Sequence, residues 1–251
     1  MNDLKKRMRV IITASATGTL LEWYDLFLAI ILAKALSTNF FPDSDSTAFL
    51  ETLAIVGSSF FVRPIGSLIF GSVGDRTGRK RSFLLSLLLM GAATFLIGLI
   101  PDFNMIGWMA PICLLVLRLV QGFALSGEYS GAIIYTCENS PPDKRGYYTG
   151  FTQATVPVGL LLCLMVVILV QSTMSSEDFN DWGMRIPFLS SVVLVLFSYL
   201  IRRRMEETPY FLQLKQSGNI AKSPVKEVLS DKPTLKLMLK LIGPFAPDEM
   251  L

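Results

Sequence analysis

A short charged block, Gly71–Arg81, lies between two long apolar segments of the chain. Apolar runs joined by so few residues must cross a bilayer, turn sharply and cross back. Gly74 and Gly78 provide the backbone freedom for that turn. The side on which the turn lies is marked by four basic residues: Arg76, Arg79, Lys80 and Arg81. The block therefore predicts a membrane hairpin whose turn faces the cytoplasm.

The composition also indicates a membrane protein. Of the 251 residues, 51% are hydrophobic and 17% are charged, and the mean hydropathy is +0.50. A soluble domain of this length would need more polar surface. The absence of histidine from the sequence excludes His-based catalysis, His metal sites and a His proton relay. The three cysteines, Cys113, Cys137 and Cys163, form no CxxC pattern, so we expect neither a metal site nor a cofactor.

Six apolar segments are long enough to span about 30 Å of hydrocarbon. They run approximately over 10–36, 48–73, 82–101, 108–137, 149–172 and 185–201. The first is too long and too charged for a cleaved signal peptide, because it contains Glu22 and Asp25. We therefore predict an all-α membrane protein with six transmembrane helices. Its expected parts are a bundle over 1–204, a cytoplasmic loop over 205–234, and the start of a seventh helix over 235–251, broken at Pro244 and Pro247.

The basic residues predict the orientation of the bundle. All but four of the 23 Lys and Arg residues fall on one side, and nine of them follow the sixth span, beginning with Arg202. The opposite loops are acidic, with Asp43, Asp45, Asp102, Glu177, Asp178 and Asp181. Both termini of this multi-pass cell membrane protein (plasma or inner membrane) are therefore expected in the cytoplasm. The exceptions are Lys34 and Arg185, which can snorkel at span ends, and the intramembrane Arg63 and Arg118.

Ionisable residues inside a span are costly and mark candidate functional sites. Asp25 and Arg118 both lie near the middle of their spans, so we expect them to form an ion pair. Protonation of Asp25 would release Arg118 for a substrate; the alternative is a buried strut that locks two helices. Glu22 shares a helix face with Asp25 and either faces water or pairs with Arg63, and Gln121 shares a face with Arg118.

Two further groups in the spans each allow two interpretations. Glu128, near the inner end of the fourth span, is either a gating group or, in a structural role, a cap on a neighbouring helix. Trp23, Tyr24 and Phe27 surround Asp25 and could form an aromatic box for a cationic ligand. The alternative for these three rings is packing or lipid contact.

A set of motifs distributed over roughly residues 15–215 resembles one known group of carriers. The motifs are Glu22-Trp-Tyr-Asp25, Arg63-Pro-Ile-Gly66, the Gly71–Arg81 loop, Arg118-x-x-Gln-Gly122, Gly127-Glu-Tyr129, Glu138, Lys144-Arg-Gly146, 181–188 and 206–209. Together they resemble the metabolite–proton symporter group of the major facilitator superfamily, which carries proline and betaine, α-ketoglutarate, citrate or shikimate. The last two motifs are most similar to the proline/betaine members. Ser126 departs from the group, many of whose members have glycine there.

The resemblance implies a carrier of twelve helices in two halves, each an inverted 3+3 repeat, of which this chain is the N-terminal half. It implies a solute site near the midplane, lined by helices 1 and 4. It also implies an inner gate, a charge network that joins the loop to Glu138 and Arg145. The loop residues of that gate are Gly71, Asp75, Arg76, Gly78, Arg79 and Lys80. The alternative for the basic residues is a topogenic loop that binds anionic headgroups.

Two functions follow from these observations. The first is proton-coupled symport of a small organic solute, with a separately made second half or as a homodimer. The second is a truncated, transport-inactive membrane fragment or interaction partner. A zwitterion such as the osmoprotectants proline and betaine would suit the Asp25–Arg118 pair, whereas an organic diacid would use Arg63 and Arg118. The chain has neither a nucleophile–base set nor a nucleotide loop, and its basic tail follows a membrane helix, so we expect neither an enzyme nor a nucleic-acid-binding protein.

Overall fold

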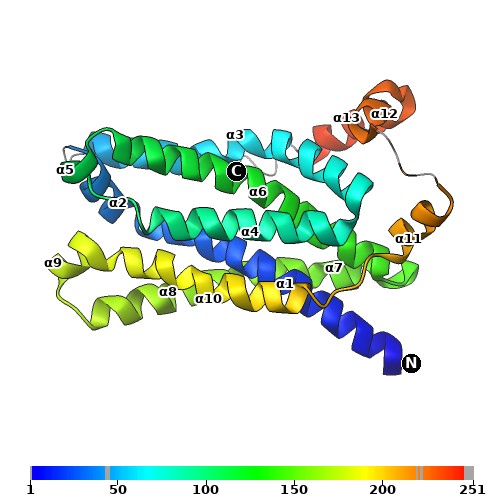
Figure 1. The fold of residues 1–251 in the computed structure, drawn as a ribbon, viewed down its shortest axis with the longest axis horizontal. Coiled ribbons are helices and arrows are strands. Elements are labelled where there is room, and N and C mark those ends of the chain that lie inside the picture. Colours follow the sequence, from blue (N-terminus) through cyan, green and yellow to red (C-terminus); the bar gives the residue numbers. More distant parts are fainter. Residues whose placement is uncertain (1, 43–45, 219, 221–222, 246–251) are drawn as a thin grey trace.

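The computed structural model describes residues 2–42, 46–218, 220 and 223–245, and all regular structure within them is helical. Five stretches of the described residues are long and apolar enough to cross a membrane. They are α3 (Ser46–Thr77), α4 (Arg79–Ile97), α6 (Met109–Asn139), Pro142–Ser172 with α7 (Arg145–Gln153) and α8 (Thr155–Ser172), and α10 (Arg185–Arg202). α1 (Asn2–Ile31) is as long but more polar, because it carries the basic N-terminal residues and three acids, among them Glu22 and Asp25. With α1 the bundle has the six long helical segments that were predicted (Figure 1).

One residue, Gly78, forms the whole connection between α3 and α4. Its φ of 106° lies in the region that favours glycine, and a Cβ there would overlap the carboxylate of Glu207. Across the turn, Ser82 Oγ donates a hydrogen bond to the Phe70 carbonyl oxygen at 2.9 Å. Gly74, which the sequence suggested as a second flexible position, is instead a buried residue inside α3. A single left-handed residue therefore makes the hairpin.

The six helices pack in a pattern that repeats between the first three and the last three. α3 packs on α6 as α8 packs on α1, and α4 packs on α6 as α10 packs on α1. The contacts α1–α6 and α4–α10 join equivalent helices of the two triplets. This is the arrangement expected of one half of a major facilitator fold, built from two three-helix repeats.

The two ends of the bundle differ in chemistry. The basic end holds the N-terminus, the Gly78 turn and α7, and the opposite end holds the short helices α2 (Ala33–Phe40), α5 (Phe103–Ile106), α9 (Ser176–Asp178) and the π-helical turn Phe179–Gly183 (Figure 1). At the opposite end Arg185 forms an ion pair with Asp102, and Lys34 is exposed. Asp43 and Asp45 lie outside the described residues.

The segment after the bundle is helical. Thr208 caps α11 (Pro209–Gln216), because its Oγ1 accepts a hydrogen bond from the Phe211 N–H at 3.3 Å. α12 (Pro224–Ser230) and α13 (Lys232–Phe245) follow. Whether the helix breaks at Pro244 stays a prediction, because Pro244 lies in α13 one residue before Phe245, the last residue described; Pro247 lies outside the described residues.

The buried apolar side chains of the described residues form three clusters. Successive parts of α1 belong to a cluster around Met8 at the basic end, a middle cluster around Leu21, and the largest cluster, which begins at Tyr24. Large apolar side chains stay exposed on the outside of the bundle, among them Phe61, Ile65, Leu161, Leu169, Val193 and Phe197. Such surfaces are expected to contact lipid or another protein.

Candidate functional site

The carboxylate of Asp25 is the centre of a buried polar network. Asp25 and Arg118 form the predicted ion pair, in which Arg118 Nη1 lies 3.0 Å from Asp25 Oδ2. The other oxygen, Oδ1, accepts hydrogen bonds from Gln121 Nε2 at 2.7 Å and from Thr94 Oγ1 at 2.9 Å. Gln121 Oε1 also accepts a hydrogen bond from Arg118 Nη1 at 2.8 Å. The network therefore joins α1, α4 and α6 at one acidic group.

Arg118 is less fully satisfied than Asp25. Its Nε and Nη2 are buried and have no hydrogen-bond partner among the described residues. Leaving a buried donor unpaired costs about 1–3 kcal/mol, which a purely structural strut would be expected to avoid. This cost favours the interpretation that the Asp25–Arg118 pair can rearrange.

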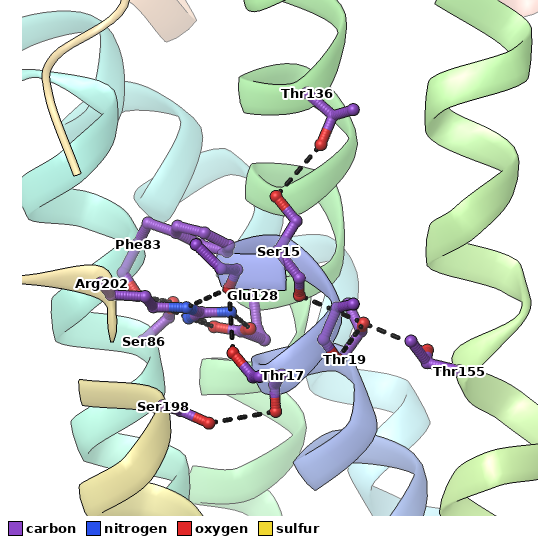
Figure 2. A network of polar contacts seen from close by, with 12 residues as sticks. Ser15, Thr17, Thr19, Phe83, Ser86, Glu128, Thr136, Thr155, Ser198 and Arg202 are labelled. Atoms are coloured by element: carbon purple, nitrogen blue, oxygen red, sulfur yellow. Dashed lines mark hydrogen bonds and ion pairs between the residues drawn. The ribbon is translucent and has the colours of Figure 1, made fainter. Parts of the chain in front are cut away.

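Glu128 of α6 and Arg202 of α10 form a second ion pair (Figure 2). It lies nearer the basic end than the Asp25–Arg118 pair, because Arg202 ends α10 and Glu128 follows Arg118 along α6. Both side chains are completely buried. Arg202 Nη1 donates a hydrogen bond to Glu128 Oε2 at 2.6 Å, and its Nη2 contacts Oε1. Arg202 Nε also donates a hydrogen bond to the Ala14 carbonyl oxygen at 3.0 Å, and its Cζ lies 3.6 Å from the centre of the Phe83 ring. This arginine therefore contacts all three neighbouring helices, α1, α4 and α6.

The backbone of α1 approaches this second pair closely. A Cβ at Gly18 would overlap both the Arg202 guanidinium and the Glu128 carboxylate. Ser86 Oγ donates a further hydrogen bond to Glu128 Oε2 at 3.3 Å. Of the two sequence interpretations of Glu128, a gate or a structural role, this geometry favours the structural role.

The burial of Arg202 corrects one sequence inference. Arg202 was counted with the basic residues that follow the sixth span, but it lies inside the bundle, whereas its neighbours Arg203 and Arg204 are exposed. The signal in the sequence that could have predicted a buried arginine was Glu128, an acid inside a span that needs a positively charged partner. The sequence alone could not show which of three consecutive arginines provides it.

A pocket of about 340 Å³ opens beside these networks. Glu22 and Trp23 of α1, Arg63 of α3 and Gln153 of α7 contribute to its walls, together with Tyr129 of α6, whose hydroxyl donates a hydrogen bond to Gln153 Oε1 at 2.9 Å. The structure thus places Glu22 and Arg63 at one pocket. No salt bridge within 4.0 Å joins them among the described residues.

The aromatic residues near Asp25 do not form a box. Tyr24 is buried, and its hydroxyl donates a hydrogen bond to the Pro187 carbonyl oxygen of α10 at 2.8 Å. Trp23 faces the pocket and lies 5.9 Å from Phe27, measured between ring centres. Of these three aromatic residues, Trp23 lines the pocket, whereas Tyr24 is a contact between helices.

At the basic end, Arg79 is the centre of a third charge network. Its guanidinium lies 2.7 Å from Asp75 and 3.2 Å from Glu138. Both contacts are expected for the inner gate that the resemblance implies. The sequence reasoning named Glu207 only as part of the 206–209 motif and gave it no role in the gate. Glu207 accepts hydrogen bonds from the backbone N–H groups of Arg79 at 2.9 Å and Lys80 at 3.2 Å. These are the first N–H groups of α4, which attract negative charge.

The other residues implied for the gate have different positions. Lys80 Nζ donates a hydrogen bond to the Arg203 carbonyl oxygen at 2.9 Å, and Gly71 lies within α3. Arg76 and Arg145 are exposed, and neither forms an ion pair with a described residue. The structure therefore brings Asp75, Arg79 and Glu138 together but leaves Arg145 outside the network.

Replacing Glu207 with Gln is expected to lower the stability of the bundle by about 1 kcal/mol, because the first turn of α4 loses its anionic cap. The measurement is the apparent melting temperature of the purified protein in detergent. Glu206→Gln is the matched control, since the Glu206 side chain is exposed. Equal melting temperatures for the two variants would show that the cap does not stabilise α4.

Comparison with known proteins identifies relatives over most of the chain. The sequence pattern of the family described as "Sugar (and other) transporter" matches residues 10–240. The shikimate transporter of Escherichia coli (strain K12) is 42% identical over 231 residues, which cover 90% of this chain and 53% of the relative. The proline/betaine transporter of the same organism is 38% identical over 208 residues, which cover 82% of this chain and 42% of the relative.

A solved structure has the same fold. The E. coli proton:xylose symporter XylE, of the major facilitator superfamily, aligns with a TM-score of 0.75 and 20% identity, over 86% of this chain and 48% of the symporter. At this level of identity the likeness concerns the fold. The chain thus spans about half the length of the relatives that it matches.

Proposed function

Because this chain belongs to the sugar (and other) transporter family of the major facilitator superfamily, we propose that it forms the N-terminal half of a proton-coupled transporter. The cargo is a small organic solute. The main support for the proposal is the Asp25–Arg118 ion pair, in which an acidic and a basic residue are buried in the middle of a membrane bundle. Charged groups at this depth are rare and are typical of proton and substrate pathways.

The proposed coupling step is the protonation of Asp25. A neutral Asp25 attracts Arg118 less strongly, while Gln121 and Thr94 can still hydrogen-bond to it. Arg118, which already has two unsatisfied nitrogen atoms, then becomes the group that must find new partners. A change in protonation is in this way converted into a rearrangement between α1 and α6.

The proposed solute is a small carboxylate that binds on the face lined by Glu22, Trp23 and Arg63. The opposite charges of Glu22 and Arg63 suit a zwitterion such as proline or betaine, and Arg63 alone suits an organic acid such as shikimate. Arg118 is buried in its pair, so this proposal assigns the solute carboxylate to Arg63 in place of Arg118.

The basic end is proposed to face the cytoplasm of a multi-pass inner or plasma membrane protein, because the basic residues gather there. Protease digestion of inverted membrane vesicles checks this, since it should cut the 205–234 segment only in that orientation. In the proposed carrier the Asp75–Arg79–Glu138 network is part of an inner gate. The other side of that gate, and the remaining walls of the solute site, come from a complementary half or a second copy of the chain.

Uptake of labelled proline, glycine betaine and shikimate into energised cells tests the proposal, with and without a protonophore. The chain is expressed alone and together with the downstream reading frame. Protonophore-sensitive uptake in either case supports proton-coupled transport and names the solute. Uptake of none of the three above the vector control, by membranes that contain the folded protein, would contradict the proposed function.

A further inference from the structure

A groove lies between the N-terminal part of α1 and the start of α7, at the basic end of the bundle (Figure 1). Its volume of about 730 Å³ falls within the range of about 300–1,000 Å³ that is typical of ligand pockets. The two sites, this groove and the solute pocket, have no lining residue in common. We call it the α1–α7 groove, and the described residues that line it are Met8, Arg9, Ile12, Lys144, Tyr147, Tyr148 and Phe151.

The α1–α7 groove carries two positive charges that no described residue neutralises. The side chains of Arg9 and Lys144 are exposed, and neither forms an ion pair with a described residue. None of the described lining residues is acidic, although Asp143 directly precedes Lys144 in the chain. The hydroxyl groups of Tyr147 and Tyr148 form no hydrogen bond with a described residue. Two cations and two O–H donors are therefore available to an anion.

Both walls of the groove change from charged to apolar in the same direction. α1 and α7 both begin at the basic end and run into the bundle (Figure 1). On one wall Ile12 lies about one turn deeper than Arg9, and on the other Phe151 lies about 10 Å deeper than Lys144 along the helix, with Tyr147 between them. Tyrosine is favoured at the membrane–water interface. The groove is thus charged at headgroup level and apolar at the level of acyl chains.

The floor of the groove is packed, and part of its wall is open. Met8 is only 1% exposed and belongs to the apolar cluster at the basic end, against which Tyr148 also packs. Tyr147 and Phe151 are 67% and 41% exposed, and their rings meet edge to face with centres 5.3 Å apart. The groove is therefore preformed, and its exposed rings are free to contact an apolar chain.

We propose that the α1–α7 groove binds an anionic phospholipid from the leaflet at the basic end of the bundle. The phosphate lies between Arg9 and Lys144, and an acyl chain packs on Ile12 and Phe151. A basic pocket between membrane helices is the kind of site that anionic headgroups occupy. A free phosphate would use the two cations but not the apolar part of the groove. The bound lipid joins α1 to α7.

The pocket on another side of α1 provides a comparison within the same molecule. It has a volume of about 430 Å³ and is also lined by two basic residues, Lys6 and Arg204. However, Glu206 lies in its wall, so an anionic headgroup there would meet a carboxylate. The charge pattern therefore favours the α1–α7 groove as the lipid site.

The first test is a lipid titration of the purified chain in detergent, followed by native mass spectrometry. The probes are phosphatidylglycerol, phosphatidylcholine with the same acyl chains, and glycerol 3-phosphate, which carries the phosphate without a chain. Phosphatidylglycerol is expected to bind saturably and about tenfold more tightly than phosphatidylcholine, whose choline cancels the phosphate charge. An equal concentration of glycerol 3-phosphate should not displace it, because the acyl-chain contacts are lost.

The decisive variant is Arg9→Gln/Lys144→Gln. It is expected to weaken the binding of phosphatidylglycerol about 30-fold, since each basic residue near an anionic surface contributes about fivefold. The matched control is Lys6→Gln/Arg204→Gln, which removes the same charge from the other pocket beside α1 and should change the binding little. All four side chains are exposed, so both double variants should stay monodisperse on gel filtration.

Two further measurements test the apolar part and the location of the site. Phe151→Ala should weaken the binding of phosphatidylglycerol several-fold, whereas Phe61→Ala, an exposed ring outside the groove, should not. A photoactivatable phosphatidylglycerol in nanodiscs should label peptides that contain residues 8–12 and 144–151.

Four results would overturn the proposal. They are equal weakening by the two double variants, binding that does not saturate, displacement by glycerol 3-phosphate, and no phosphatidylglycerol bound by the monodisperse protein. The first would show that the lipid responds only to the total basic charge, and the third would make the ligand a soluble phosphate. None of these measurements involves transport, so their outcome is independent of the proposed function, which is judged by solute uptake.

Discussion

Replacing Asp25 with Asn is expected to abolish proton-driven accumulation of solute while part of the solute exchange remains. Asn keeps the shape of the side chain and can still hydrogen-bond to Gln121 and Thr94, but it cannot take up a proton or carry the charge that holds Arg118. Loss of a positioned proton-transfer group typically costs about 100-fold or more in rate. The measurement compares protonophore-sensitive uptake with counterflow exchange in proteoliposomes that contain the transporting form of the protein.

The control for this variant is Asp143→Asn, because Asp143 is an exposed acid at the basic end of the bundle. It should transport like the wild type. Arg118→Ala should reduce protein yield, since it leaves Asp25 buried without its counter-charge. Full accumulation of solute by Asp25→Asn would show that the Asp25–Arg118 pair has only a structural role. A normal yield of Arg118→Ala would show that the stability of the protein does not depend on the pairing.

Replacing Arg202 with Met is expected to destabilise the bundle by about 3–5 kcal/mol, the range for breaking a buried ion pair by removing one partner. The loss is large because Arg202 is completely buried and contacts α1, α4 and α6 at once. The expected result is a marked fall in the apparent melting temperature and in the monodisperse fraction on gel filtration in detergent.

The adjacent Arg203→Met is the matched control, because the Arg203 side chain is exposed and the substitution removes the same charge from the protein. The double variant Glu128→Gln/Arg202→Met should recover much of the loss, because it removes the uncompensated charge that the single variant leaves. A single variant as stable as Arg203→Met would show that the buried pair contributes little.

The spans and the Asp25–Arg118 pair could be predicted because each depends on one strong physical rule. Apolar runs long enough for a bilayer must be helical, and opposite charges at the same membrane depth must find each other. Both inferences hold in the structure, with the first span more polar than the others because it includes the basic N-terminal residues. The rest of that network could not be predicted: Thr94 is one of many hydroxyl residues in the spans, and nothing in its local sequence marks it.

The errors arose where the tertiary fold decides between equivalent residues. Three consecutive arginines follow the sixth span, and helix phase alone directs Arg202 inward. Tyr24 lies beside Asp25 in sequence, yet its hydroxyl points to α10. Glu207 is far from the Gly78 turn in sequence and reaches it only because the chain folds back after α10. Side-chain direction of this kind requires the packed structure.

The contacts of Arg202 also impose an order on biosynthesis. Glu128 enters the bilayer with α6, well before α10 has been made. Of the hydrogen-bond partners that its side chain has among the described residues, Ser86 is the one already present at that stage. A carboxylate held at that depth must keep a proton or remain near water until its counter-charge arrives. α10 therefore completes the bundle by bringing the counter-charge of Glu128, and a chain that ended before residue 202 would leave this acid without it.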